Sequence, residues 1–104
     1  PYLGDIGYRL VGGRLLPAEE RAAAQFMYED VRGRRLTLYV AGSPDRARET
    51  SFRYAEQNGV STFYWIEGGL GYALSGELAR EELLEVAEAV YRDIAMRPRK
   101  PRGE

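Results

Sequence analysis

Apolar residues recur at every second position through much of residues 24–40, which is the spacing of a β-strand with one buried face. The sequence "DVRGR" at residues 30–34 interrupts this pattern and is typical of a type I turn followed by Gly33 in the left-handed conformation. Such a turn pairs Asp30 with Arg34 and predicts an antiparallel hairpin. Its register places on one apolar face the pairs Tyr28 with Leu36, Phe26 with Leu38 and Ala24 with Val40, and on a mixed face Glu29 with Arg35, Met27 with Thr37 and Gln25 with Tyr39.

Two tight turns predict three further strands between residues 52 and 76. Asn58-Gly59 favours a two-residue type I′ turn that pairs Gln57 with Val60, and Gly68-Gly69 favours a second turn that pairs Glu67 with Leu70. The stretch "STFYWIEGGLGYALSG", residues 61–76, therefore indicates a strand, a tight turn and a strand, and not a phosphate-binding loop. Both turns place the same apolar set on one face of this meander: Phe52, Tyr54, Phe63, Trp65, Tyr72 and Leu74.

The reverse face of the meander combines large and small residues. Gly71 is expected opposite Ile66 and Ala73 opposite Tyr64, so that small residues leave an open groove beside two large ones. The first strand of the chain, a second subunit, or a peptide or lipid-like ligand would each suit such a face. The candidate interaction surface consists of Arg53, Tyr64, Ile66, Gly71 and Ala73.

The two ends of the chain complete the predicted fold. Residues 7–16 favour a strand with a bulge at Gly12-Gly13, ended by Pro17, and residues 79–96 have the apolar spacing of one amphipathic helix. The fold class is α+β: an antiparallel sheet of about six strands, a hairpin plus a meander, with one C-terminal helix packed on one face. We expect a single domain over residues 1–96 and a basic flexible tail over 97–104.

Composition narrows the possible chemistry. The 104 residues include no cysteine and no histidine, so there is no thiol nucleophile, no imidazole base and no ordinary zinc site. The carboxylates lie mostly on the solvated face of the helix or beside turns, and no serine has a candidate base. A net charge of −1 does not favour nucleic acid. We therefore predict no catalytic residue, no cofactor, no metal site and no enzymatic activity.

Several ordered blocks resemble the C-terminal region of proteobacterial transmembrane anti-sigma factors, which hold extracytoplasmic-function sigma factors. The most particular blocks are "LVGGRLLP", "MYED" with "GRRLTLYV", and "FYW" with "GGLGYALSG". The resemblance spans about residues 3–95, nearly the whole chain. It implies a non-enzymatic sensor or regulatory domain in the periplasm that controls release of the sigma factor.

The same resemblance implies a longer parent protein anchored in the inner membrane by a single helix. A short N-terminal cytoplasmic segment would bind the sigma factor, and a periplasmic protease or sensor protein would be a further partner. The chain begins at Pro1 and lacks the first two parts, so we expect a piece of such a protein and no sigma-binding residue within it. Two other interpretations stay open from the residues: a small cytosolic ligand-binding domain, and a homodimerisation module.

Overall fold

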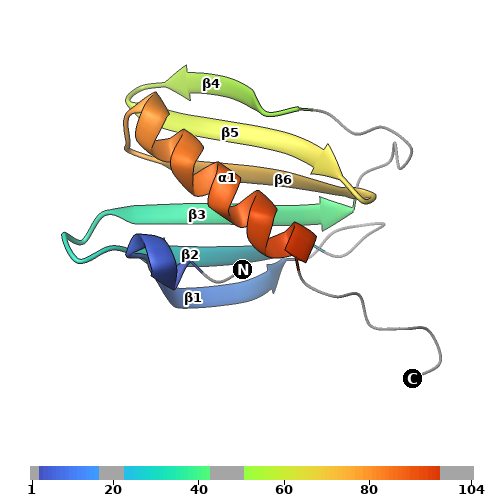
Figure 1. Cartoon of the computed structure of the whole chain (residues 1–104), viewed down its shortest axis with the longest axis horizontal. Helices are drawn as coiled ribbons and strands as arrows, with labels where there is room; N and C mark the ends of the chain where they lie inside the picture. Colours follow the sequence, from blue (N-terminus) through green and yellow to red (C-terminus); the bar gives the residue numbers. More distant parts are fainter. Residues whose placement is uncertain (1–2, 17–22, 43–50, 97–104) are drawn as a thin grey trace.

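The computed structural model describes residues 3–16, 23–42 and 51–96, and it confirms the α+β class (Figure 1). One antiparallel sheet has the strand order β1-β2-β3-β6-β5-β4, and one long helix crosses one of its faces (Figure 1). Pro17, which was expected to end the first strand, and the predicted basic tail over 97–104 lie outside the described residues. The elements are a 3-10 helix η1 (Gly4–Ile6), β1 (Arg9–Leu16), β2 (Ala23–Glu29), β3 (Arg35–Gly42), β4 (Arg53–Gln57), β5 (Val60–Glu67), β6 (Leu70–Gly76) and α1 (Arg80–Met96).

Both predicted hairpin registers are confirmed. In the β2–β3 pair, Phe26 lies opposite Leu38 and every other predicted pair is present. In the meander, Tyr54 lies opposite Phe63 on β5, and Phe63 lies in turn opposite Leu74 on β6. The registers follow from the turns because a shift by one residue would move the whole apolar set to the other face.

The turns have the backbone conformations that their residues favour. Gly33 has a φ of 83°, and the Asp30 carbonyl accepts a hydrogen bond from its N–H at 3.0 Å. Asn58 and Gly59 have φ values of 54° and 81°, as a type I′ turn requires. Asn58 is the one non-glycine residue with a positive φ in the described part of the chain. These local conformations explain why the sequence alone specified the hairpins.

The pairing of β3 with β6 joins the N-terminal hairpin to the meander. Leu38 lies opposite Leu74 and Tyr39 lies opposite Ala73, although each pair is separated by more than thirty positions along the chain. No turn specifies this register, and it was not predicted from the sequence. The result is one continuous sheet with a shared core face.

The core lies between this sheet face and α1. Leu83, Val86, Ala87 and Val90 of the helix are buried, and Tyr91 is exposed. Trp65 stacks on Tyr72 with ring centroids 5.1 Å apart. The aromatic face predicted for the meander is therefore the face that α1 covers. The buried hydrophobic side chains of the sheet are Tyr28, Leu36, Leu38, Phe63, Trp65, Tyr72 and Leu74.

The N-terminal region departs from the prediction in two respects. The strand begins at Arg9, because Gly7 adopts a φ of 89° and ends the 3-10 helix η1. The bulge is present, but the register shifts between Leu10 and Gly12, so that Val11 is the extra residue. β1 pairs with β2 at the edge of the sheet. The interpretation in which the first strand covers the reverse face of the meander is therefore wrong.

Candidate interaction surface

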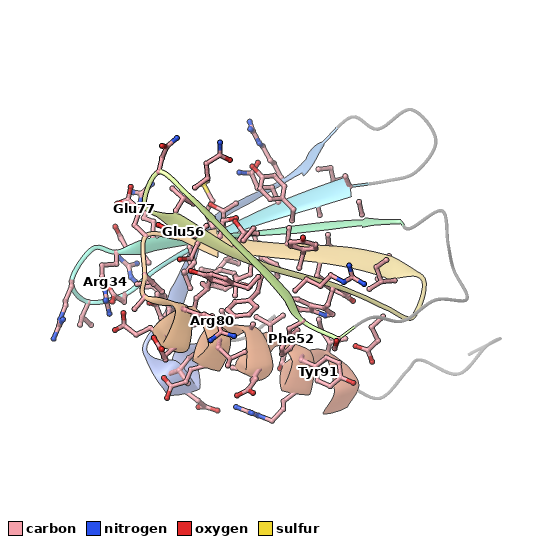
Figure 2. All side chains as sticks on the ribbon, turned by 90° about the horizontal axis from the view of Figure 1, so that it is seen from above. Arg34, Phe52, Glu56, Glu77, Arg80 and Tyr91 are labelled. Carbon is pink, nitrogen blue, oxygen red and sulfur yellow. The ribbon has the colours of Figure 1, made fainter. Side chains whose placement is uncertain are left out.

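The sheet has one face covered by α1 and one face that no described element covers. Successive residues of a strand point to opposite faces, so the residues that alternate with the core set all lie on this second face. Figure 1 shows α1 on the first face, and Figure 2 shows Phe52, Arg80 and Tyr91 on the same side as that helix. We call the second face the open face.

A row of aromatic and small residues crosses the open face. Ala73 on β6 lies between Tyr39 on β3 and Tyr64 on β5, and Arg53 on β4 lies opposite Tyr64. Tyr39 is 43% exposed and Tyr64 is 42% exposed. Two half-exposed aromatic rings therefore flank a methyl group on a central strand of the sheet.

A second row lies beside the first. Gly71 on β6 lies between Ala41 on β3 and Ile66 on β5. A β-carbon built on Gly71 would make only an ordinary contact, 3.8 Å from the Ala41 carbonyl oxygen. The two rows place small residues of β6 beside larger side chains of β3 and β5. We call this arrangement the β6 trough; it consists of Gly71 and Ala73, with the larger side chains of Tyr39, Tyr64 and Ile66 as its walls.

All five residues predicted for the interaction surface lie on the open face, by the alternation of the observed registers. Arg53, Tyr64 and Ala73 lie in one row, and Ile66 and Gly71 in the next. Tyr39 was missed as a wall of the trough. The predicted register put Tyr39 on the mixed face of the first hairpin, but only the β3–β6 pairing brings it next to Ala73.

The rest of the open face is polar. Glu29 accepts ion-pair contacts from Arg9 at 3.6 Å and from Arg35 at 3.4 Å, and the Arg14 Nε donates to the Gln25 side chain at 3.2 Å. Exposed pairs of this kind contribute little to stability. They do mark the β1–β2 end of the open face as a solvated surface, which leaves the β6 trough as its most apolar part.

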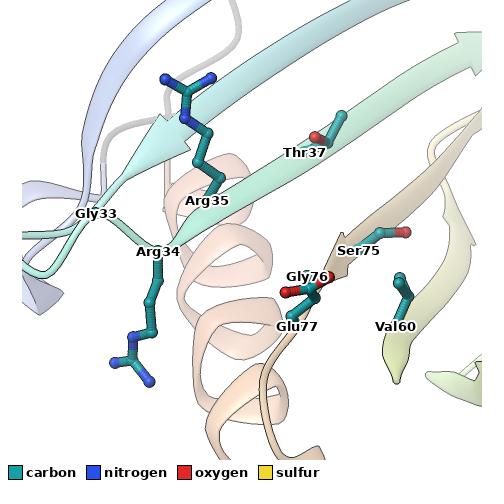
Figure 3. Close-up of a pocket in the computed structure, with 8 residues that line it drawn as sticks. All are labelled: Gly33, Arg34, Arg35, Thr37, Val60, Ser75, Gly76 and Glu77. Carbon is teal, nitrogen blue, oxygen red and sulfur yellow. The ribbon is translucent and has the colours of Figure 1, made fainter. Parts of the chain in front are cut away.

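A cavity of about 520 Å³ lies at one end of the sheet (Figure 3). Its two arginines already have partners, since Arg34 Nε donates to Asp30 at 2.9 Å and Arg35 contacts Glu29. The Ser75 hydroxyl of this cavity forms a hydrogen bond with the Thr62 hydroxyl at 2.8 Å. The cavity is lined by Gly33, Arg34, Arg35, Thr37, Val60, Ser75, Gly76 and Glu77.

The ionisable groups with clear shifts serve the fold. Burial raises the pKa of Tyr72, and the Glu67 carboxylate raises it further, so this phenol stays neutral inside the core. Burial likewise raises the pKa of Tyr8. In the described part of the chain, no three acidic side chains are grouped as a metal site would need. The β6 trough, by contrast, presents aromatic rings, methyl groups and backbone.

Comparison with known proteins identifies no matching family model, no matching curated protein and no matching solved structure. The resemblance to anti-sigma factors consequently stays a prediction made from the sequence blocks. Among residues 3–16, 23–42 and 51–96, no helix has the length and apolar character needed to cross a membrane.

Proposed function

We propose that this chain is a non-enzymatic regulatory domain of a transmembrane anti-sigma factor and acts in the periplasm. The structural observation that supports a binding role is the open face, where half-exposed tyrosines stand beside the small residues of the β6 trough. Aromatic residues with low side-chain entropy are typical of protein-binding surfaces. The anti-sigma assignment itself rests on the sequence blocks between residues 3 and 95.

In this proposal the domain controls proteolysis of its parent protein. A periplasmic protease or sensor protein would bind the open face, and this contact would set whether the membrane-bound anti-sigma factor is cleaved. Cleavage would release the sigma factor, which is held by a cytoplasmic segment that precedes the membrane helix. No residue described here would touch the sigma factor.

The location of the domain is tested by a fusion to the parent protein. Alkaline phosphatase, which is active only outside the cytoplasm, is joined after Glu104 and assayed in intact bacteria. We expect high activity. A well-expressed fusion without activity would place the domain in the cytoplasm, refute the sensor role and favour the small ligand-binding domain.

The open face is tested with Tyr64→Ala and Ile66→Asp in the parent protein. We expect each variant to change transcription from a promoter that depends on the sigma factor, while the thermal unfolding of the purified domain changes little. The matched control is Tyr91→Ala, because Tyr91 is 41% exposed and lies on the helix side. If the two open-face variants unfold the domain, or if they leave transcription at the control level, the binding role of this face is wrong.

A further inference from the structure

The two edges of the sheet differ in how open they are to further pairing. The β1 edge has the bulge at Val11, and a bulge disrupts the ladder and opposes the addition of another strand. The β4 edge has a regular register over all five of its residues, and no described strand pairs with its outer side. β4 is therefore the edge where a further strand fits.

The turn at Asn58-Gly59 determines which backbone groups point outward from β4. The residues that flank a two-residue turn form a hydrogen-bonded pair, so Gln57 bonds to Val60 across the hairpin. Hydrogen-bonded positions alternate along an antiparallel pair. The N–H and C=O groups of Tyr54 and Glu56 therefore point away from β5 and are available to a strand that pairs with the outer side of β4.

Two charged side chains next to this edge have no ion-pair partner among the described residues. Glu56 is exposed on β4, on the same side of the strand as Tyr54. The Arg80 guanidinium lies over the Tyr54 ring, 5.4 Å from its centroid. Arg80 is also the first residue of α1, where the helix dipole disfavours a positive charge. A carboxylate placed beside Tyr54 would therefore be stabilised by Arg80.

We propose that β4 pairs antiparallel with β4 of a second copy of this chain, with Ala55 opposite Ala55 on the two-fold axis. In this register Glu56 of each copy lies opposite Tyr54 of the other and reaches the Arg80 that covers it. The outward groups of Tyr54 and Glu56 then form the hydrogen-bonded pairs, and the small Ala55 side chains meet at the axis.

The charges exclude the neighbouring registers that would use the same backbone groups. A register with Tyr54 opposite Tyr54 of the second copy would bring the two Arg80 guanidinium groups together. A register with Glu56 opposite Glu56 would place two carboxylates side by side. Like charges directly opposite each other destabilise a strand pair. The Ala55-centred register alone places opposite charges together, and it does so twice because of the symmetry.

The dimer would join two six-stranded sheets into one sheet with both β4 strands at its centre. The two open faces would then form one continuous surface, with Arg53 of each copy near the axis. This proposal does not depend on the proposed function, because it concerns the strand edge and not the open face or the location of the domain.

The proposal is tested by a charge exchange on the 104-residue chain. Sedimentation equilibrium over the micromolar to millimolar range should show a monomer of 11.8 kDa in exchange with a dimer of twice that mass. Glu56→Arg and Arg80→Glu should each weaken the dimer about tenfold or more, since each converts two attractive pairs into two repulsive ones. The double variant, which exchanges the two charges, should recover most of the dimerisation.

The control is Glu85→Arg, which makes the same charge change as Glu56→Arg at an exposed position of α1 more than one turn from Arg80, and it should leave the dimer unchanged. Circular dichroism establishes that each variant is folded. If Glu56→Arg does not fold, Arg80→Glu with Glu85→Arg still gives a decisive comparison. A wild-type chain that stays monomeric over the whole range overturns the proposal. So does a dimer that neither reversal weakens, because it would use another surface.

Discussion

Gly76 shows how a single residue determines the contact between two strands. It ends β6 opposite Leu36 of β3, and a β-carbon built on it would lie 2.5 Å from Leu36 Cδ2 and 3.2 Å from the Arg35 carbonyl oxygen. Leu36 is buried and cannot move aside freely, and a backbone oxygen cannot move without distorting β3. The close approach of β3 and β6 at this end therefore requires glycine.

We predict that Gly76→Ala lowers the free energy of unfolding by about 1–3 kcal/mol, because the new methyl group overpacks the core. The matched control is Gly71→Ala on the same strand, where the added atom meets only an ordinary contact at 3.8 Å. Its free energy of unfolding should stay within about 1 kcal/mol of the wild type. Urea unfolding measures the free energy of unfolding of both variants. Equal losses of stability in the two would contradict the steric explanation.

At the scale of elements, the β2–β3 turn is held by one carboxylate. Asp30 Oδ1 accepts hydrogen bonds from the backbone N–H groups of Arg32 at 3.0 Å and Arg34 at 2.8 Å, and Oδ2 accepts one from Arg34 Nε at 2.9 Å. Burial alone would raise the pKa of Asp30, but these hydrogen bonds outweigh it and hold the pKa below its ordinary value of 3.8. The ionised side chain is thus part of the turn.

This shift predicts a pH dependence of stability. Since the folded pKa of Asp30 lies below the unfolded one, its contribution is complete above the unfolded pKa and is lost as the pH falls through the folded pKa. Asp30→Asn should therefore be less stable than the wild type near neutral pH, and the difference in the free energy of unfolding should narrow as the pH falls through the unfolded and then the folded pKa of Asp30. Urea unfolding across this range gives the comparison. A difference that does not change with pH would show that Asp30 acts only through groups that do not titrate.

The elements themselves were predicted well because their signals are local. The turns at Gly33 and at Asn58-Gly59 each specify a register within a few residues, and the aromatic face follows from that register by alternation. The helix start was also close, since α1 begins at Arg80 and Leu83 N–H bonds the Ala79 carbonyl at 2.9 Å. The 3-10 helix η1 was missed, because its three residues are too few to show a period.

At the scale of the whole molecule, the pairing of β3 with β6 joins the N-terminal hairpin and the meander into one sheet. Leu38 and Leu74 lie opposite each other on this pair, and both are completely buried under α1 and the neighbouring strands. Each also has a partner within its own hairpin, Phe26 for Leu38 and Phe63 for Leu74. Packing at this junction therefore links the N-terminal hairpin to the meander.

We predict that Leu38→Ala and Leu74→Ala each lower the free energy of unfolding by about 2–5 kcal/mol, because each leaves a cavity. The loss in the free energy of unfolding of the double variant should be smaller than the sum of the two single losses by about 0.5 kcal/mol or more, since the two side chains share one site. The control cycle combines Leu38→Ala with Val31→Ala. Val31 is 98% exposed, so the two changes in the free energy of unfolding should add. Separate unfolding transitions for the two halves would contradict a single cooperative unit.

The sequence by itself determined the strands, the turns and the registers of both hairpins, and with them the five residues of the candidate interaction surface. These features depend on contacts between residues close in the chain, where the turn type and the alternation of side chains specify a single register. The tertiary structure alone decided the β3–β6 register, the position of β1 at the edge and the place of Tyr39 in the wall of the β6 trough. No local pattern specifies a pairing between distant strands, because it is selected by the packing of the whole core under α1.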